Sequence, residues 1–238
     1  MARSAAWRVK RRACELPRAR EVHLPLGRRD RRLRVPHLCY TDGVSRPRDQ
    51  RYHEILESAA KLIFQSGYEA TSMQEIAEAC GLTKAGLYHH IKTKEALLLA
   101  IMHYGMDLFD DMVIAKVSDI VDPVARLREC MARNIALVTQ DSSKEVTIIL
   151  HEHQTLTGAA RQEINTRKKR YVRFLEAAFR EAIERGQVRA VDPTLAAFSF
   201  LGVVLWTYKW YRADGKLGPR QLADGMSDLF FEGLMPRS

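Results

Sequence analysis

Cysteine is scarce in this sequence, and the few cysteines that it has are scattered. The 238 residues include only Cys14, Cys39, Cys80 and Cys130, and no two of them have the C-x-x-C spacing of many zinc and redox sites. Nothing in their pattern indicates a disulfide framework, which fits a reducing cytoplasm. The start of the chain also lacks the apolar core of a signal peptide, because arginine and proline interrupt it throughout. We therefore expect a cytoplasmic protein.

Catalytic motifs are missing as well. The sequence contains no Ser-His-Asp signature, no phosphate-binding glycine loop and no paired-carboxylate motif. One cluster, His151-Glu152-His153, could suggest a metal ion, but residues two apart do not share a face of a helix. We therefore expect no cofactor, no metal and no enzymatic activity, and a helical metal-binding enzyme is the remote alternative.

Apolar segments of membrane-spanning length are also absent. The most apolar stretch, LAAFSFLGVVLWTY at residues 195–208, is shorter than the ~20 residues that cross a bilayer. Because it is apolar or small nearly all round, a helix formed by it should be buried by protein on every side. The sequence therefore predicts no membrane contact.

Positive charge is abundant but unevenly placed. The net charge is +9, and most of the excess comes from the arginines of residues 1–48. The rest of the chain is not basic overall, so a DNA-binding surface would have to be a local patch around Lys84, His89, His90 and Lys94.

Residues 1–48 are interpreted as a basic N-terminal arm. Prolines at positions 17, 25, 36 and 47 would each break or end a helix, and the segment has no sustained periodicity. We expect this arm to be disordered. Two alternatives stay open: an arm that follows the DNA backbone or enters a minor groove, and a translation start further along, for instance at Val44.

The stretch TSMQEIAEACGLTKAGLYHHIKTKEAL, residues 71–97, organises the chain. Ser72 followed by Glu75 has the spacing of a capping box and predicts the start of a short helix. Gly81 can take the left-handed conformation that ends this helix. Thr83 then caps a second helix, and Thr93 caps a long third one that begins at Lys94. Two short helices joined by a tight glycine-containing turn are typical of a helix-turn-helix.

The second of these helices has little that belongs in a core. Leu87 is its one large aliphatic residue, and the small Ala85 and Gly86 would let the backbone lie close to a partner surface. Such a helix suits the major groove of DNA and its phosphates. The alternative is an exposed amphipathic hairpin in a helical protein, since motif matches on spacing alone can be false.

The order of residues around the motif resembles the DNA-binding domain of the TetR family of repressors. The likeness runs without a gap from about Ile55 to Leu98, with Gly67-Tyr68, Thr71-Ser72, Ile76-Ala77, Gly81, Leu87-Tyr88, His90 and Lys94-Glu95. The sequence departs from the family at Ile91, a packing position where phenylalanine is usual. The resemblance implies these DNA-binding residues: Thr71, Ser72, Thr83, Lys84, Ala85, Gly86, Tyr88, His89, His90 and Lys94.

Helical periodicity extends over the rest of the chain, and we find no strand signal. Further helices are predicted from Asp49 to Gly67, Lys94 to about Ser118, Pro123 to about Val138, Lys144 to Thr155, 159 to 185, 195 to 208, and from Pro219. The predicted fold is therefore all-α with about nine helices. Residues 49–96 would form a three-helix DNA-binding domain, and residues 97–238 a ligand-binding and dimerisation domain.

Four aromatic residues lie at the end of the apolar stretch, namely Trp206, Tyr208, Trp210 and Tyr211. Aromatics at helical spacing are more often packing or dimer contacts than a ligand-pocket wall, and both readings stay open. Residues 144–234 resemble, more loosely, the C-terminal region of TetR-family repressors of fatty-acid and steroid breakdown that respond to acyl-CoA thioesters. The resemblance implies a long apolar cavity with a basic edge, and these ligand-binding residues: His151, Arg170, Trp206, Trp210 and Arg212.

The basic edge would use the charged run on the helix at 159–185, where Arg167, Lys168, Arg170 and Arg173 are available. Such a run is also common on a solvated surface. The last two helices offer apolar stripes for an isologous four-helix dimer interface. The residues expected there are Phe198, Leu201, Leu205, Leu222, Met226, Leu229 and Phe230.

The sequence thus predicts a ligand-responsive, homodimeric transcription regulator that binds double-stranded operator DNA. By family resemblance it would be a repressor, released from a palindromic operator when an apolar effector such as an acyl-CoA fills the body. The helix from Lys94 would be the two-state element, because its tilt sets the spacing of the two DNA-binding ends. The alternative is a regulator of an efflux or drug-response gene with an uncharged lipophilic effector.

Overall fold

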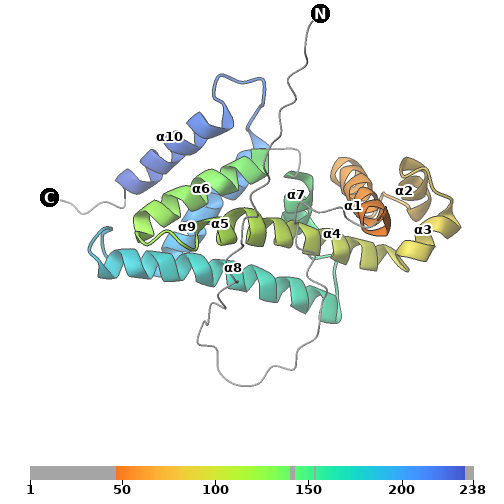
Figure 1. Ribbon diagram of the computed structural model, residues 1–238, viewed down its shortest axis with the longest axis horizontal. Helices are drawn as coiled ribbons and strands as arrows, with labels where there is room; N and C mark the ends of the chain where they lie inside the picture. The colour runs from red at the N-terminus through yellow and green to blue at the C-terminus, as the bar shows by residue number, and fades with distance from the viewer. Residues whose placement is uncertain (1–46, 140–142, 153, 234–238) are drawn as a thin grey trace, which may run out of the picture. The chain divides into compact units, whose positions relative to one another are not determined.

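The computed structural model describes residues 47–139, 143–152 and 154–233 (Figure 1). The chain divides into two units, residues 1–43 and 44–238, and all described residues belong to the second. Nearly all of the expected N-terminal arm lies outside the described residues. The secondary structure over the described ranges is helical and contains no strand, which confirms the predicted all-α fold.

The helices follow the predicted order. They are α1 (Pro47–Ser66), α2 (Met73–Ala79), α3 (Lys84–His90), α4 (Lys94–Phe109), α5 (Ala115–Val117), α6 (Pro123–Thr139), α7 (Ser143–His151), α8 (Gly158–Glu184), α9 (Pro193–Leu205) and α10 (Pro219–Glu232). A π-helical turn, Asp110–Ile114, joins α4 to α5 without a break, so the three pieces form the single long helix predicted from Lys94. Counted in this way, the described ranges contain the nine predicted helices.

The three N-terminal helices α1–α3, termed the head, pack around the fully buried Ile55, Ile76 and Leu87. Local signals set their ends as predicted, because Ser72 forms the capping box of α2 and Gly81 takes a φ of 63° after it. The guanidinium of Arg51 in α1 donates to the carbonyl oxygen of Cys80 and ties α1 to the end of α2.

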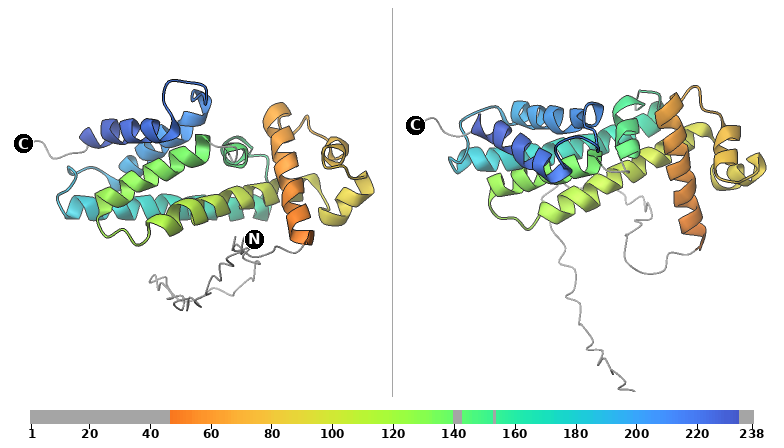
Figure 2. Two further views of the ribbon diagram at one scale, coloured as in Figure 1. Left: turned by 45° about the horizontal axis from the view of Figure 1, so that its top comes forward. Right: turned by 90° about the horizontal axis from the view of Figure 1, so that it is seen from above.

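The remaining helices, α4–α10, are termed the body. α6 packs against α8, α9 and α10, and α4 runs beside α8 (Figure 2). Rings of Phe179, Phe200 and Phe230, from α8, α9 and α10, meet with centroids 5.8 to 6.2 Å apart and bring these helices together. α7 packs against α1 of the head and against α4 and α6 of the body. In the described part of the chain, no helix is long and apolar enough to cross a membrane.

Two helices differ from their predictions. α7 ends at His151 instead of near Thr155, because the chain bends at Glu152 and the fully buried Leu156 turns back into the core. α9 was expected to be covered on every side, but Leu195 is 60% and Phe198 57% exposed. The body of one chain covers only one side of α9, and its other side remains apolar and open.

Candidate DNA interface and effector pocket

The second helix of the helix-turn-helix, α3, presents a polar outer side. Leu87 is fully buried and fixes α3 to the head, whereas Lys84, Ala85 and His89 are exposed and the adjacent Tyr88 and His90 are half-buried. The exposed Thr83 caps the helix, with its Oγ1 accepting the Gly86 N–H at 3.1 Å. α3 contains no carboxylate. Its exposed side is therefore suited to a polyanion such as DNA.

Gly86 is inside α3 and does not need glycine for its backbone conformation. An added Cβ would lie 3.3 Å from Oγ1 of the capping residue Thr83, a tight contact, and 3.8 Å from Leu82. Glycine in a helix interior costs about 1 kcal/mol relative to alanine. The residue therefore fits the expectation that the backbone of α3 approaches another molecule closely.

Lys94 and Thr71 both donate to carbonyl oxygens of the turn before α2, but Thr71 is buried there. The Lys94 ammonium donates to the carbonyl oxygen of Glu69 at 3.3 Å and lies 4.2 Å from the centroid of the Tyr68 ring. Thr71, expected among the DNA contacts, is only 3% exposed, and its hydroxyl donates to the carbonyl oxygen of Gly67 at 2.8 Å. Its side chain is therefore unavailable to DNA and instead supports the turn.

Two further residues complete this surface. Ser72 is exposed, and its Oγ accepts the Glu75 N–H at 3.2 Å as the cap of α2. Lys92, which the sequence analysis did not include, is exposed just after α3, and its ammonium donates to the carbonyl oxygen of Tyr88 at 3.1 Å. Its position between α3 and Lys94 was the signal that could have identified it.

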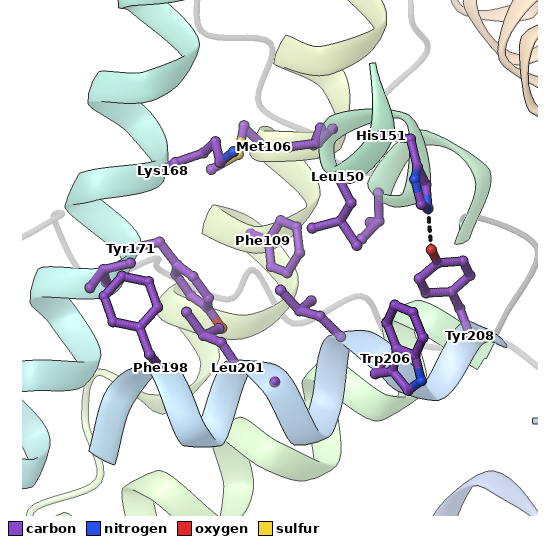
Figure 3. Close-up of a pocket in the computed structure, with 15 residues that line it drawn as sticks. Met106, Phe109, Leu150, His151, Lys168, Tyr171, Phe198, Leu201, Trp206 and Tyr208 are labelled. Atoms are coloured by element: carbon purple, nitrogen blue, oxygen red, sulfur yellow. Dashed lines mark hydrogen bonds between the residues drawn. The ribbon is translucent and has the colours of Figure 1, made fainter. Parts of the chain in front are cut away.

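The body contains an apolar pocket between α4, α7, α8 and α9 (Figure 3). Its volume is about 470 Å³, within the range of small-molecule sites. Most of its wall is aliphatic or aromatic. The lining residues are Met106, Phe109, Val146, Ile149, Leu150, His151, Lys168, Tyr171, Val172, Phe198, Leu201, Gly202, Leu205, Trp206 and Tyr208.

Two basic side chains lie at opposite ends of this wall (Figure 3). Lys168 is half-buried, and burial lowers the pKa of its ammonium below the ordinary value. No other described residue forms a hydrogen bond or ion pair with it. At the other end, His151 Nε2 is hydrogen-bonded with the Tyr208 hydroxyl. An unpaired cation in an otherwise apolar wall favours a ligand that brings an acceptor or a negative charge.

The expected ligand-binding residues divide into two groups. His151 and Trp206 are in the pocket wall, whereas Trp210, Arg170 and Arg212 are outside it. Arg170 pairs with Asp110 in the π-helical turn, and the exposed Arg212 pairs with Asp214 at 3.3 Å.

Arg167, also expected at the basic edge, is occupied in the same way as Arg170. Its guanidinium contacts Asp107 at 2.6 Å and Asp110 at 2.7 Å, and it also donates to the carbonyl oxygen of His103 at 3.1 Å. These contacts fasten α8 to α4 beside the pocket, so Arg167 is less available to a ligand than its place in the sequence suggested.

The residues expected in the dimer interface are also divided. Leu201 and Leu222 are buried within the chain, because α9 packs on α8 and α10 packs on α6. Leu201 and Leu205 belong to the pocket wall together with Phe198. Met226 and Phe230 are half-buried, and Leu229 is 77% exposed. Of the residues expected in the interface, Phe198 and Leu229 are thus the exposed ones, and Leu195 is exposed in addition.

Among the described residues, no group of three or more His, Cys, Asp and Glu side chains could hold a metal ion. His153, part of the His151-Glu152-His153 cluster, lies outside these residues. The site as it stands consists of a helix-turn-helix with a basic outer side, one long helix leading away from it, and an apolar pocket in the body. These features are typical of a DNA-binding regulator with a small-molecule site in its body.

Comparison with known proteins identifies the family. Residues 55–101 match the bacterial regulatory proteins of the tetR family, and residues 121–234 match the tetracyclin repressor-like C-terminal domain. The chain belongs to the tetR family of transcription regulators, and it is a DNA-binding protein rather than an enzyme.

Several relatives are similar over nearly their whole length. The crystal structure of AibR in complex with isovaleryl coenzyme A and operator DNA is 61% identical, with a TM-score of 0.73 over 79% of this chain and 100% of that one. PfmR from Thermus thermophilus, a TetR family transcriptional regulator, is 32% identical, with a TM-score of 0.69 over 76% and 99% of the two chains. The transcriptional repressor KstR2 of Mycobacterium tuberculosis is 27% identical over 76% of this chain and 91% of its own.

Proposed function

We propose that this chain is a homodimeric repressor that leaves a palindromic operator when an acyl-CoA fills the pocket of the body. The observation that carries the proposal is the apolar pocket with the Lys168 ammonium in its wall, for which the described part of the chain supplies no hydrogen-bond or ion-pair partner. The AibR structure, which contains isovaleryl coenzyme A and operator DNA, supports a short branched acyl thioester as the effector class.

The pocket suits the two chemically different parts of such an effector. Its acyl group would lie against Phe109, Val146 and Leu201, where each buried CH₂ contributes about 0.8 kcal/mol. The Lys168 ammonium would meet an oxygen of the thioester or of the pantetheine arm. Because Arg167 and Arg170 are already paired with carboxylates, the phosphates would have to use other cations of α8.

Lys169 and Arg173 are the cations of α8 that we assign to the phosphates. Both are exposed, they lie one helical turn apart, and neither forms an ion pair with another described residue. Lys169 follows Lys168 along α8 but does not line the pocket, so the proposed phosphate site would flank the pocket-lining side of the helix. This assignment keeps Arg173 from the expected basic edge, adds Lys169, and leaves out Arg167 and Arg170.

The head and body would divide the work between them. Residues 49–96 would bind DNA through α2, α3 and Lys94, and residues 97–238 would bind the effector and a second copy of the chain in the cytoplasm. The open apolar side of α9, with Leu195 and Phe198, and the exposed Leu229 of α10 would form the dimer interface. The operator half-sites of such dimers lie about 34–36 Å apart or at a multiple of that spacing.

The proposal is tested by operator release from the full chain. An operator is selected from randomised duplexes, and the labelled complex is titrated with isovaleryl-CoA, a long-chain acyl-CoA, free isovalerate, free CoA and an uncharged lipophile such as an isovalerate ester. We expect isovaleryl-CoA to release DNA at concentrations at least about tenfold below those of free isovalerate or free CoA, because both parts of the thioester contribute to binding. Equal release by the free acid, or release by an uncharged lipophile alone, would reject the acyl-CoA proposal in favour of a lipophilic effector.

Lys168→Met tests the part played by the ammonium. Methionine has a flexible chain of similar length, so it fills the same wall without the charge. We expect the concentration of isovaleryl-CoA needed for half-release to rise by about tenfold, the loss of one charged hydrogen bond. Lys116→Met, at an exposed position of α5, is the matched control and should leave this concentration unchanged. An unchanged response of Lys168→Met would remove Lys168 from the effector site.

A further inference from the structure

At the end of α7, one residue belongs to the pocket wall and the next one contacts the head. His151 ends α7 in the pocket wall, where its Nε2 is hydrogen-bonded with the Tyr208 hydroxyl (Figure 3). The next residue, Glu152, contacts the head instead, because its Oε1 accepts the backbone N–H of Tyr68 at 3.3 Å. A displacement of His151 therefore has a direct route to the head.

Tyr68 is at the point where the helix-turn-helix begins. It follows Gly67, which ends α1 with a φ of 84°, and it precedes Ser72, the cap of α2. Tyr68 is 8% exposed, and the Lys94 ammonium lies 4.2 Å from the centroid of its ring. The Glu152 carboxylate thus contacts the turn that orients α2 and Lys94, the lysine proposed to contact DNA.

The corner that contains Glu152 is firmly held at its other side. The Thr155 hydroxyl donates to Glu152 Oε2 at 3.2 Å, and Leu156 is fully buried. The Thr157 hydroxyl donates at 3.2 Å to Oε1 of Glu95, in the first turn of α4. These contacts connect Glu152, Thr155 and Thr157 to the head and to the first turn of α4.

We infer that Glu152 is a positioning residue that couples effector binding in the pocket to operator binding by the head. The inference rests on the proposed function, in which an effector occupies the pocket beside His151. An effector that engages His151, or separates it from Tyr208, moves the end of α7. Glu152 then transmits the movement to Tyr68 and Lys94. The coupling depends on the contact and not on the affinity of either site alone.

A thermodynamic cycle tests this inference. The operator Kd is measured with and without saturating isovaleryl-CoA, and the effector Kd is measured without DNA, for the unmodified chain, Glu152→Ala and Glu184→Ala. Allosteric coupling factors are commonly about 5- to 150-fold. We expect the ratio of operator Kd values, measured with and without effector, to fall in Glu152→Ala below about a third of that of the unmodified chain, whatever change the operator Kd without effector shows. Glu184, exposed at the end of α8, is the matched control and should keep the full ratio.

The possible outcomes separate this inference from the proposed function. A full ratio in Glu152→Ala would overturn the inference and leave the proposed function intact. A ratio of about one in the unmodified chain would overturn the proposed function itself. If Glu152→Ala does not fold, Tyr208→Phe decides, because it removes the pocket-side contact of His151 without touching the head. A reduced ratio in that variant, at saturation judged by its own effector Kd, supports the inference, and an unchanged ratio contradicts it.

Discussion

The carboxyl group of Glu145 gives a quantitative test of how α7 is packed against the head. Glu145 lies in the first turn of α7, is 4% exposed, and its Oε2 has no hydrogen-bond partner in the described part of the chain. Burial raises the pKa of this carboxyl to about 7, and the negative charge of Glu57 on α1 acts in the same direction. Its own backbone N–H and Lys144 act against the rise.

The sign of the effect on stability follows from the higher pKa of the folded chain. The unfolded chain loses the Glu145 proton near pH 4.5, whereas the folded chain keeps it up to about pH 7. The stabilising contribution of the protonated carboxyl is therefore fully present below pH 4.5, decreases as the pH rises, and is lost above about pH 7. At 1.36 kcal/mol per pKa unit, the gap corresponds to at most about 3 kcal/mol of unfolding free energy.

Glu145→Gln isolates this contribution, because glutamine keeps the shape of the side chain and does not titrate. Urea unfolding is followed at several values between about pH 5 and pH 8. The unfolding free energy of the variant, relative to the unmodified chain, should increase by up to about 3 kcal/mol over this range. Glu184→Gln, at an exposed position, should show no such trend. A pH-independent difference between Glu145→Gln and the unmodified chain would show that the Glu145 carboxyl does not have a raised pKa in the folded chain.

Three further predictions concern DNA contact and assembly. Lys94→Ala should weaken binding to all DNA sequences alike and lower the salt slope by about one, whereas loss of preference for one base at an unchanged slope would show that Lys94 reads sequence. Gly86→Leu should abolish operator binding, and the thermal midpoint is measured beside it because the added Cβ would lie 3.3 Å from Thr83 Oγ1; normal binding would exclude close approach of α3 to DNA. Leu229→Arg should turn a dimer into a monomer in light scattering, because Leu229 is 77% exposed on α10, and an unmodified chain that is already monomeric at micromolar concentration would rule the dimer out.

The head could be predicted closely because its signals are local. The Ser72 and Glu75 capping box, the left-handed Gly81 and the Thr83 cap act over three or four residues, and all three form as expected. The long fourth helix was also predicted, but its π-helical turn at Asp110–Ile114 was not, since the sequence there carries no proline or glycine to mark an irregularity.

The pocket could be predicted only in part, because its polar contacts join residues far apart in sequence. Nothing near Arg170 shows that Asp110 will pair with it. Lys168 lines the pocket, whereas Arg170, two positions later, does not. Helical periodicity alone cannot distinguish the two, because it does not show which side of α8 is covered by α4. The burial of Thr71 could not be predicted either, because it depends on how α1 packs against α2.

The most direct test of the account is reciprocity between the pocket and the head. The Kd of isovaleryl-CoA is measured by calorimetry for the free chain and for the chain saturated with operator. If the two sites are linked, operator weakens effector binding by the same factor by which effector weakens operator binding. Equal effector Kd values for the free and operator-bound chain would contradict the claim that the pocket controls DNA binding.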